Sequence, residues 1–259
     1  MKVILSGGGT GGHVYPAIAI ANKIKEHHPD AEILFVGTKA GIEAEIVPKY
    51  GYRIKYIDVQ GFRRKIDLEN VKRLIKFLKS LGDSKRIIKR FKPDLVIGTG
   101  GYVSGSVVLK ASKMGIKSCI HEQNSFPGMT NKMLSKNVDI VMTSFEDSHK
   151  RFPDQAQDKL TFTGNPVRDE ILNSDKAESR KKLGLTPDEK MLLVAGGSGG
   201  SEEINNALKK LIPALVKDKI AFTIATGRAY YDQFMKDYGD LEFGQNQKIL
   251  PYLDDMANN

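Results

Sequence analysis

Residues 3–13, with the sequence VILSGGGTGGH, decide the fold of the first half of the chain. Val3–Ser6 is a short apolar run typical of a buried strand, and most of residues 7–12 are glycines. An apolar-periodic helical pattern follows, with Pro16 where a first helical turn tolerates it. Such a loop lets a ligand approach the backbone closely, and the helix N-terminus attracts phosphate. Because a ligand-free turn does not need so many glycines, the stretch predicts a phosphate-binding loop.

The same loop matches the dinucleotide-binding pattern G-x-G-x-x-G through Gly7, Gly9 and Gly12. A dinucleotide site also needs an acidic residue near the end of the second strand, where the acid binds the ribose. The second strand pattern ends in Phe35–Thr38, which contains no acid. The sequence therefore disfavours a nicotinamide dinucleotide as the ligand.

Outward from this loop, short apolar runs alternate with longer helical patterns. The strand patterns lie at 3–6, 33–37, 53–58, 94–98, 117–120, 138–142 and 160–163, and the helical patterns at 14–27, 41–50, 67–90, 104–114, 127–136 and 145–152. Strands that alternate with helices are typical of an α/β protein with a parallel sheet covered on both faces. Gly164–Pro166 then interrupts the alternation and marks a predicted hinge.

The hinge predicts two domains, residues 1–163 and residues 164–259. The alternation restarts in the second domain, with strand patterns at 191–195, 220–225 and 248–250 and helical patterns at 201–217 and 229–238. A doubly wound sheet usually has about six strands, more than this segment supplies. We therefore expect the second domain to be incomplete in this chain.

Two further glycine loops, at 98–105 and 196–201, also follow predicted strands and open predicted helices. Three such loops at the carboxyl ends of parallel strands, divided between two domains, predict a cleft that binds more than one phosphate-bearing molecule. The sequence contains no D-x-D, C-x-x-C or Walker lysine motif, so we expect no protein-bound metal. Arg168, just after the hinge, can supply positive charge to a diphosphate instead.

Composition narrows the choice of function. The chain has 259 residues, a single cysteine (Cys119) and no apolar run long enough to span a bilayer, which favours a soluble cytoplasmic protein. Residues 53–92 contain 14 basic and 4 acidic residues, and this local excess is larger than the net charge of +9 of the whole chain. The excess favours an anionic partner, either a membrane surface or a nucleic acid, although a solvated lysine-rich helix has the same composition.

Five motifs occur in an order and at a spacing that resemble the MurG family of bacterial N-acetylglucosaminyltransferases. These motifs are Gly8–His13, Gly100–Gly105, His121–Asn124, Gly164–Arg168 and Asp254–Met256. The resemblance covers essentially the whole chain and implies a GT-B fold, in which two Rossmann-like, doubly wound domains face each other across a cleft. Family members continue well beyond the last motif, so we expect this chain to be C-terminally truncated.

The resemblance also implies the reaction. N-acetylglucosamine would pass from UDP-N-acetylglucosamine to lipid I, undecaprenyl-diphospho-N-acetylmuramoyl-pentapeptide, with inversion at the anomeric carbon. The product would be lipid II, a precursor of peptidoglycan, and no cofactor is implied. Carried over by motif, the donor contacts would be Thr10, Gly11, Gly12, Asn124, Arg168, Ser198 and the backbone of Leu253. The acceptor contacts would be Gly8, Gly9, Gly100, Gly101, Tyr102 and Ser104.

The reaction needs a base for the acceptor hydroxyl and stabilisation of the departing UDP. His13 lies beside the first glycine loop and is one candidate base; it could instead hydrogen-bond a phosphate or have a structural role. Glu122 is the alternative base, and a carboxylate at this position could equally orient sugar hydroxyls.

The helical pattern at 67–90 has an unusually wide apolar face. Leu74, Ile75, Phe77, Leu78 and Leu81 belong to an apolar arc of about 180°, with lysines and an arginine on the other side. Contact with one core needs about 100°, so apolar surface remains for an anionic bilayer, although plain packing is the alternative. Because lipid I is a membrane lipid, we expect a peripheral protein on the cytoplasmic face of the bacterial cell membrane, with no nucleic-acid partner.

Two other functions remain open at this point. One is a different GT-B enzyme that uses a nucleotide-sugar, such as a glycolipid synthase or a nucleotide-sugar epimerase. The other is a non-catalytic module that binds anionic lipid or nucleic acid through residues 53–92.

Overall fold

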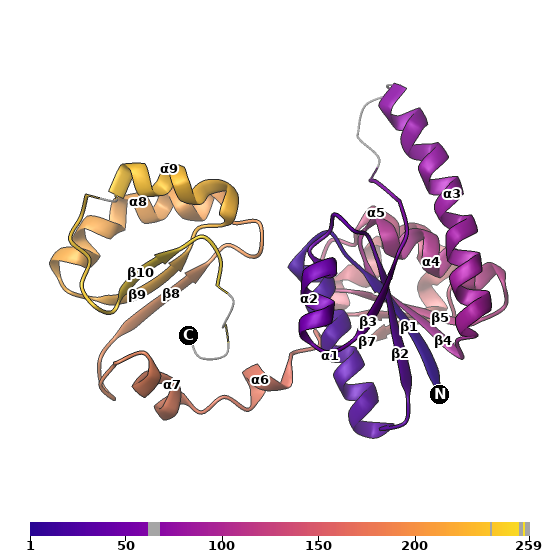
Figure 1. The fold of residues 1–259 in the computed structure, drawn as a ribbon, viewed down its shortest axis with the longest axis horizontal. Coiled ribbons are helices and arrows are strands. Elements are labelled where there is room, and N and C mark those ends of the chain that lie inside the picture. Colours follow the sequence, from indigo (N-terminus) through magenta and orange to yellow (C-terminus); the bar gives the residue numbers. More distant parts are fainter. Residues whose placement is uncertain (62–67, 239, 254–255, 257–259) are drawn as a thin grey trace. The chain divides into compact units, whose positions relative to one another are not determined.

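The computed structural model describes residues 1–61, 68–238, 240–253 and 256, and these form two compact units. Unit 1 is Met1–Arg168 and unit 2 is Asp169–Asn259, so the chain divides after Arg168, later than the hinge predicted at Gly164–Pro166. Each unit combines a parallel sheet with helices, as Figure 1 shows, which confirms the predicted α/β class. The acidic pair of the motif at 254–256 and part of the basic stretch at 53–92 lie outside the described residues.

Unit 1 is built on a parallel sheet with the strand order β3-β2-β1-β4-β5-β6-β7. The strands are β1 (Lys2–Gly7), β2 (Glu32–Gly37), β3 (Arg53–Tyr56), β4 (Leu95–Gly100), β5 (Lys117–Glu122), β6 (Ile140–Thr143) and β7 (Leu160–Phe162). The central strands are almost continuously buried, because helices cover both faces of the sheet. The order reverses between β1 and β4, and such a switch point is where open α/β sheets bind ligands.

The connections of unit 1 are helical. They are α1 (Gly11–His27), α2 (Glu43–Lys49), α3 (Leu68–Phe91), α4 (Gly101–Lys113), α5 (Met129–Ser135) and the 3-10 helices Glu146–Arg151 and Asp154–Lys159. Helices α1 and α4 begin inside their glycine loops, earlier than the helical patterns predict. No helix among the described residues combines the length and apolarity needed to cross a membrane.

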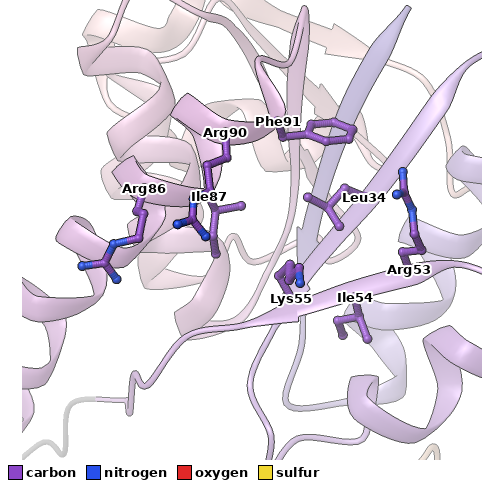
Figure 2. A pocket seen from close by; sticks show the side chains of 8 residues that line it. All are labelled: Leu34, Arg53, Ile54, Lys55, Arg86, Ile87, Arg90 and Phe91. Carbon is purple, nitrogen blue, oxygen red and sulfur yellow. The ribbon is translucent and has the colours of Figure 1, made fainter.

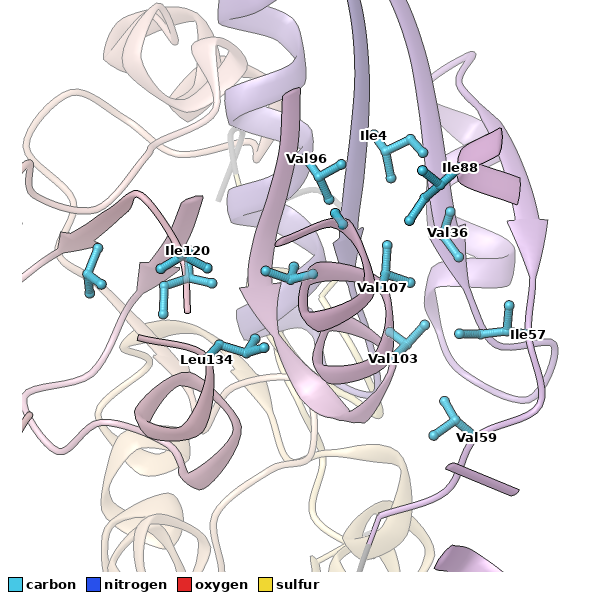
Figure 3. Packing of buried hydrophobic residues seen from close by; sticks show 14 of the residues in the cluster. Ile4, Val36, Ile57, Val59, Ile88, Val96, Val103, Val107, Ile120 and Leu134 are labelled. Carbon is cyan, nitrogen blue, oxygen red and sulfur yellow. The ribbon is translucent and has the colours of Figure 1, made fainter. Parts of the chain in front are cut away.

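Two buried clusters lie on opposite faces of the unit 1 sheet, because successive side chains of a strand point to opposite faces. On β1, Ile4 belongs to one cluster and Leu5 to the other. Figure 3 shows the first cluster, in which Ile88 of α3 and Val107 of α4 pack near Ile4. Residues of α1 such as Ile18 cover the second face. The strand ends that carry the glycine loops are therefore held by cores on both sides.

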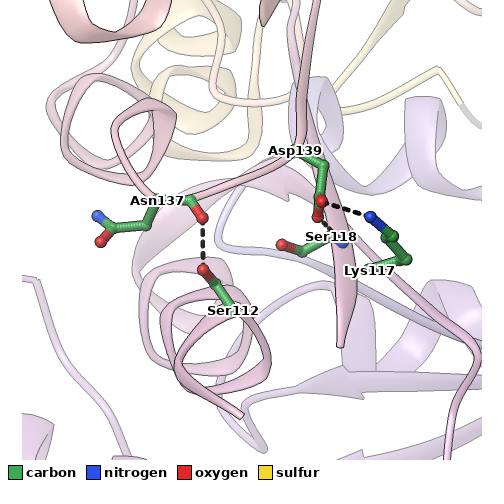
Figure 4. Close-up of polar contacts among 5 residues, drawn as sticks. All are labelled: Ser112, Lys117, Ser118, Asn137 and Asp139. Carbon is green, nitrogen blue, oxygen red and sulfur yellow. Dashed lines mark hydrogen bonds and ion pairs between the residues drawn. The ribbon is translucent and has the colours of Figure 1, made fainter. Parts of the chain in front are cut away.

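Polar contacts fix the start of β6 against β5 (Figure 4). The Asp139 carboxylate accepts a hydrogen bond from the Ser118 backbone N–H at 2.8 Å and pairs with the Lys117 ammonium at 3.0 Å. Both contacts lower the pKa of Asp139, and the hydrogen bond from the Ser118 N–H has the larger effect. On β5, burial raises the pKa of the Cys119 thiol to about 12. The thiol is therefore protonated at neutral pH and is not a nucleophile.

Unit 2 has a smaller parallel sheet with the order β10-β9-β8. Its elements are α6 (Asp169–Leu172), α7 (Lys176–Lys182), β8 (Met191–Ala195), α8 (Glu202–Lys217), β9 (Ala221–Ala225), α9 (Arg228–Tyr238) and β10 (Gln247–Leu250). The central strand β9 is entirely buried, and Phe222 and Ile224 pack with Ile212 of α8 and Phe234 of α9. This core repeats in small form the strand–loop–helix arrangement of unit 1.

Candidate functional site

The first two glycine loops meet at the switch point of unit 1. The Gly8 backbone N–H donates a hydrogen bond to the Gly100 carbonyl at 3.3 Å. Gly101 approaches Gly8 so closely that a Cβ at Gly101 would overlap the Gly8 carbonyl oxygen. Gly101 also has a φ of +82°, which disfavours other residues. The loops form one site, to which we refer as the paired-loop site, made of Gly8–His13 and Gly100–Tyr102.

Two helix N-termini open into the paired-loop site. Helix α1 starts at Gly11 and α4 at Gly101, so the first N–H groups of two long helices lie at the carboxyl ends of adjacent strands. Gly9, Thr10 and Gly12 are exposed there. Thr10 is the N-cap of α1, but its side chain makes no capping hydrogen bond. Two positive dipole ends beside an exposed glycine loop are suited to bind a diphosphate.

The His13 imidazole is oriented by the same loop. Its Nδ1 lies 3.0 Å from the Gly8 carbonyl oxygen and 3.2 Å from the Thr10 hydroxyl. Since a carbonyl only accepts, Nδ1 carries the proton in the neutral ring, and Nε2 keeps its lone pair. The side of the ring that bears Nε2 lies against the Gly100 backbone. The geometry provides a proton acceptor at the edge of the paired-loop site.

Glu43, which is not among the predicted site residues, supports this loop from behind. Its side chain is 1% exposed, and its carboxylate accepts hydrogen bonds from the Gly9 N–H at 2.9 Å and the Thr38 N–H at 2.8 Å. The Thr38 hydroxyl donates a third bond at 2.7 Å. The dinucleotide pattern expects an acid near Thr38, but here the acid comes one short loop later, at the start of α2. In the sequence, the one sign of this role is that a glutamate directly follows the loop after β2.

A second carboxylate organises the loop after β5. Glu122 is also 1% exposed and accepts four hydrogen bonds. The donors are the Asn124 N–H at 3.0 Å, the Asn124 Nδ2 at 2.9 Å, the Gly128 N–H at 2.9 Å and the Asn131 Nδ2 at 2.9 Å. Because the Asn124 amide nitrogen faces this carboxylate, its Oδ1 is left as the group for other partners. The contacts indicate a positioning role for Glu122, because its carboxylate holds the loop after β5 through four hydrogen bonds.

The Gly164–Arg168 motif is bound to unit 1. His121 Nε2 donates to the Gly164 carbonyl at 3.0 Å, and burial lowers the pKa of His121, so the ring is neutral. Arg168 Nη1 donates to the Tyr50 hydroxyl at 2.6 Å, and its guanidinium lies 4.2 Å from the centre of the Tyr15 ring. These contacts explain why the compact unit extends to Arg168. The same contacts hold Arg168, which is predicted to bind the donor, beside α1 and α2.

Two predicted acceptor contacts differ in their exposure. Tyr102 is largely exposed and its ring packs against Gly61. Ser104 is 0% exposed and lies inside α4 against Gly98 of β4. The prediction that Ser104 contacts the acceptor is therefore wrong, since α4 starts at Gly101 and turns Ser104 toward the sheet.

The third glycine loop belongs to unit 2. It follows β8 and ends at Ser201, the N-cap of α8, whose hydroxyl accepts from the Ile204 N–H at 3.4 Å. Gly200, with a φ of +78°, packs against Gly227 after β9. Ser198 is half-buried in this loop, and Leu253 is buried. Like the first loop, it connects a strand to the N-terminus of a helix. A common cleft between the domains stays a prediction.

The predicted membrane face of α3 is partly exposed. Leu74 (48%), Ile75 (61%) and Leu78 (58%) are exposed, together with Val71 (55%), which is not among the predicted contacts. Phe77 instead packs against the first core cluster, next to Gly105 of α4, and Leu81 is half-buried. Phe77 is thus half-buried beside α4, and its membrane contact stays a prediction. In Figure 1 the first turns of α3 extend past the rest of unit 1.

The described residues contain no group of three or more His, Cys, Asp or Glu side chains that could hold a metal ion. The N-termini of α1 and α4 supply partial positive charge at the paired-loop site.

Comparison with protein families gives two matches along the chain. Residues 3–143 match the model described as the glycosyltransferase family 28 N-terminal domain, and residues 191–259 match the glycosyltransferase family 28 C-terminal domain. A curated relative from Clostridioides difficile is 62% identical over 258 residues, which cover 100% of this chain. It is named UDP-N-acetylglucosamine--N-acetylmuramyl-(pentapeptide) pyrophosphoryl-undecaprenol N-acetylglucosamine transferase. This chain spans 63% of the length of that relative.

Solved structures support the fold. The crystal structure of Acinetobacter baumannii MurG is similar with a TM-score of 0.63 and 29% identity, covering 99% of this chain and 69% of that one. A putative UDP-N-acetylglucosamine 2-epimerase from Listeria monocytogenes has a TM-score of 0.69 at 13% identity, covering 99% of this chain and 71% of that one. At this identity the likeness to the epimerase concerns the fold alone.

Substituting Gly101 by alanine should destabilise unit 1 more than the same change at Gly51. Both glycines have positive φ, but only Gly101 lacks room for a Cβ. We expect Gly51→Ala to cost about 1–2 kcal/mol through the backbone conformation, and Gly101→Ala to add about 1–3 kcal/mol through overlap with Gly8. Thermal unfolding followed by circular dichroism measures both. Equal losses would contradict the close packing of the two loops.

Replacing Glu43 by glutamine should loosen the first glycine loop. The amide of glutamine cannot accept all three hydrogen bonds, so buried donors remain unsatisfied at a cost of about 1–3 kcal/mol. The matched control is Glu45→Gln on the same helix, because Glu45 is exposed and should cost under about 0.5 kcal/mol. Amide hydrogen exchange at Gly9 should accelerate only in Glu43→Gln. Unchanged exchange there would contradict the supporting role.

Proposed function

The chain belongs to the MurG family within glycosyltransferase family 28, and on this premise we propose that the protein that carries it converts lipid I to lipid II. It transfers N-acetylglucosamine from UDP-N-acetylglucosamine to the 4-hydroxyl of the muramoyl residue. The name of the Clostridioides difficile relative supports this activity. The observation in the structure that best supports it is the paired-loop site, where two helix N-termini meet at the sheet's switch point.

The two substrates each carry a diphosphate, and the site residues divide between them. We assign the acceptor diphosphate to the loop around Gly9 and to the loop of Gly100, Gly101 and Tyr102. The Gly9 N–H itself is bonded to Glu43, and Gly8 shapes the loop. The donor is assigned to Thr10, Gly11, Gly12, Asn124, Arg168, Ser198 and the Leu253 backbone. Glycine loops at helix N-termini support this division, because such loops can bind phosphate without a metal.

His13 is the proposed base. Its Nε2 accepts the proton of the acceptor hydroxyl while the hydroxyl oxygen attacks the anomeric carbon, and the bond from that carbon to UDP breaks. The hydrogen bond from Nδ1 to the Gly8 carbonyl supports this role, because it leaves the Nε2 lone pair available. Glu122 acts as a positioning residue that orients Asn124. UDP departs toward helix N-termini, whose partial charges stabilise the leaving diphosphate.

Membrane binding is assigned to the exposed face of α3. Val71, Leu74, Ile75 and Leu78 supply apolar surface, and the helix also carries exposed lysines such as Lys79 and Lys85. This combination suits the interface of an anionic bilayer, where lipid I resides. The protein therefore acts as a peripheral protein on the cytoplasmic face of the bacterial cell membrane.

The transfer is tested with the full-length protein, UDP-N-acetylglucosamine and a short-chain analogue of lipid I. We expect a disaccharide product in the presence of both substrates and at least tenfold less from UDP-glucose. His13→Ala should lower turnover by about 10²–10⁴-fold, the usual contribution of a positioned base, with donor binding retained. His28→Ala, an exposed histidine at the end of α1, is the control and should be unaffected.

Several outcomes would contradict this function. Near-normal turnover of His13→Ala would exclude His13 as the base. Formation of UDP-N-acetylmannosamine without any acceptor would instead indicate an epimerase. Binding of nucleic acid with a steep salt dependence, and no response to uridine nucleotides, would indicate a non-catalytic module.

The membrane contact is tested by the double change Ile75→Asp and Leu78→Asp. Each exposed side chain contributes about 1.5–3 kcal/mol when it is buried in the interface, so binding to phosphatidylglycerol vesicles should weaken at least tenfold. The control is Leu211→Asp, an equally exposed leucine on α8 of unit 2. Vesicle sedimentation measures the binding. Unaltered binding of the double variant would remove α3 as the membrane contact.

A further inference from the structure

A pocket outside the paired-loop site lies between the C-terminal part of α3 and the strands β2 and β3 at the edge of the unit 1 sheet. It has a volume of about 520 Å³ and is lined by strand residues on one side and the last turns of α3 on the other (Figure 2). The lining residues are Leu34, Arg53, Ile54, Lys55, Arg86, Ile87, Arg90 and Phe91. The volume is in the range of small-molecule sites.

The pocket combines an apolar floor with a cationic rim. Leu34, Ile87 and Phe91 belong to the first core cluster or pack against it. Arg53 and Lys55 are exposed on β3, the edge strand, while Arg86 and Arg90 are exposed on α3. In Figure 2 Ile87, Arg90 and Lys55 lie around the hollow beside Leu34, whereas Arg86 points away from it and Ile54 lies on the other side of β3. The lining combines an apolar floor with four cationic residues and contains no acidic residue.

Nearby carboxylates neutralise only part of this charge. Arg86 pairs with Asp83 at 2.9 Å, and Arg53 lies 3.8 Å from Glu32, which also pairs with Lys2 at 3.1 Å. Within the described part of the chain, Lys55 and Arg90 form no ion pair. The pocket therefore keeps a positive potential that favours an anion.

From this charge and floor we infer that the pocket binds an anionic phospholipid, with the phosphate at the arginines and one acyl chain on the apolar floor. A small inorganic anion would leave the floor uncovered, whereas an amphiphile satisfies both parts of the pocket. Arginine forks match phosphate geometry. A lipid is favoured over an acidic peptide because α3, which supplies half of the rim, also carries the exposed apolar residues Leu74, Ile75 and Leu78.

The binding is tested on the 259-residue chain with dihexanoylphosphatidylglycerol below its critical micelle concentration. The chain has no tryptophan, so Phe91→Trp introduces a single fluorescent reporter into the lining. We expect a saturable spectral change. Dihexanoylphosphatidylcholine and glycerol 3-phosphate should each bind at least tenfold more weakly, because one lacks the net charge and the other lacks the acyl chains. Calorimetric titration of the unsubstituted chain checks that the reporter itself does not create the site.

Two double variants with the same change of charge distinguish binding in the pocket from nonspecific attraction to the basic helix. Arg86→Glu with Arg90→Glu should weaken binding at least tenfold. Lys85→Glu with Lys89→Glu makes the same change of charge on neighbouring exposed positions of the same helix, outside the pocket lining, and should weaken it less than threefold. Circular dichroism verifies that both variants fold.

Three results would overturn the inference. These are the absence of saturable binding by the unsubstituted chain, equal losses in the two charge-reversed variants, and binding of an acidic peptide as tight as that of the lipid. None of these measurements uses UDP-sugars or lipid I, so their failure leaves the proposed transferase activity untouched. Ile75→Asp with Leu78→Asp should not change binding of the monomeric lipid, which distinguishes the pocket from the α3 membrane face.

Discussion

The backbone contact between Gly8 and Gly101 is the constraint on which the candidate site depends. It joins two loops at the one place where the strand order of the sheet reverses, and it requires that position 101 carries no side chain. The α1 and α4 N-termini consequently lie side by side, so the partial positive charges of the two helices act at the same place. A diphosphate can be held in this way by the main chain, because the cores on both faces of the sheet fix the strands that carry the loops.

Much of the architecture follows from local pattern. Apolar runs that end in glycine mark the central strands, and the alternation of strands with helices establishes the parallel sheets, since both are properties of short segments. The loops of the paired-loop site were predictable for the same reason. The first turns of α1 and α4 were assigned to loops because glycine disfavours helix interiors, whereas at a helix start it is tolerated.

The remaining features depend on contacts between distant segments. Ser104 belongs to a motif, but its burial follows from the orientation of α4 on the sheet. Phe77 is half-buried while Val71 is exposed, because α4 lies beside Phe77, and a helical wheel contains no information about neighbours. Arg168 packs on Tyr50, 118 positions earlier in the sequence, which moves the domain boundary beyond the Gly-Asn-Pro break.

Glu43 and Glu122 show how a protein can prepare anion sites by using its own anions. Each buried carboxylate binds backbone N–H groups of a loop that follows a strand of the same sheet. Those donors face inward and are satisfied, which removes the cost of leaving them buried without a partner.

The loops are thereby ordered before a substrate arrives, so binding energy is not spent on ordering them. The internal negative charge opposes a nearby phosphate, however, so the arrangement trades some electrostatic attraction for preorganisation. The N-termini of α1 and α4 provide compensating positive charge, so a site built with carboxylates in its walls can still be suited to diphosphate.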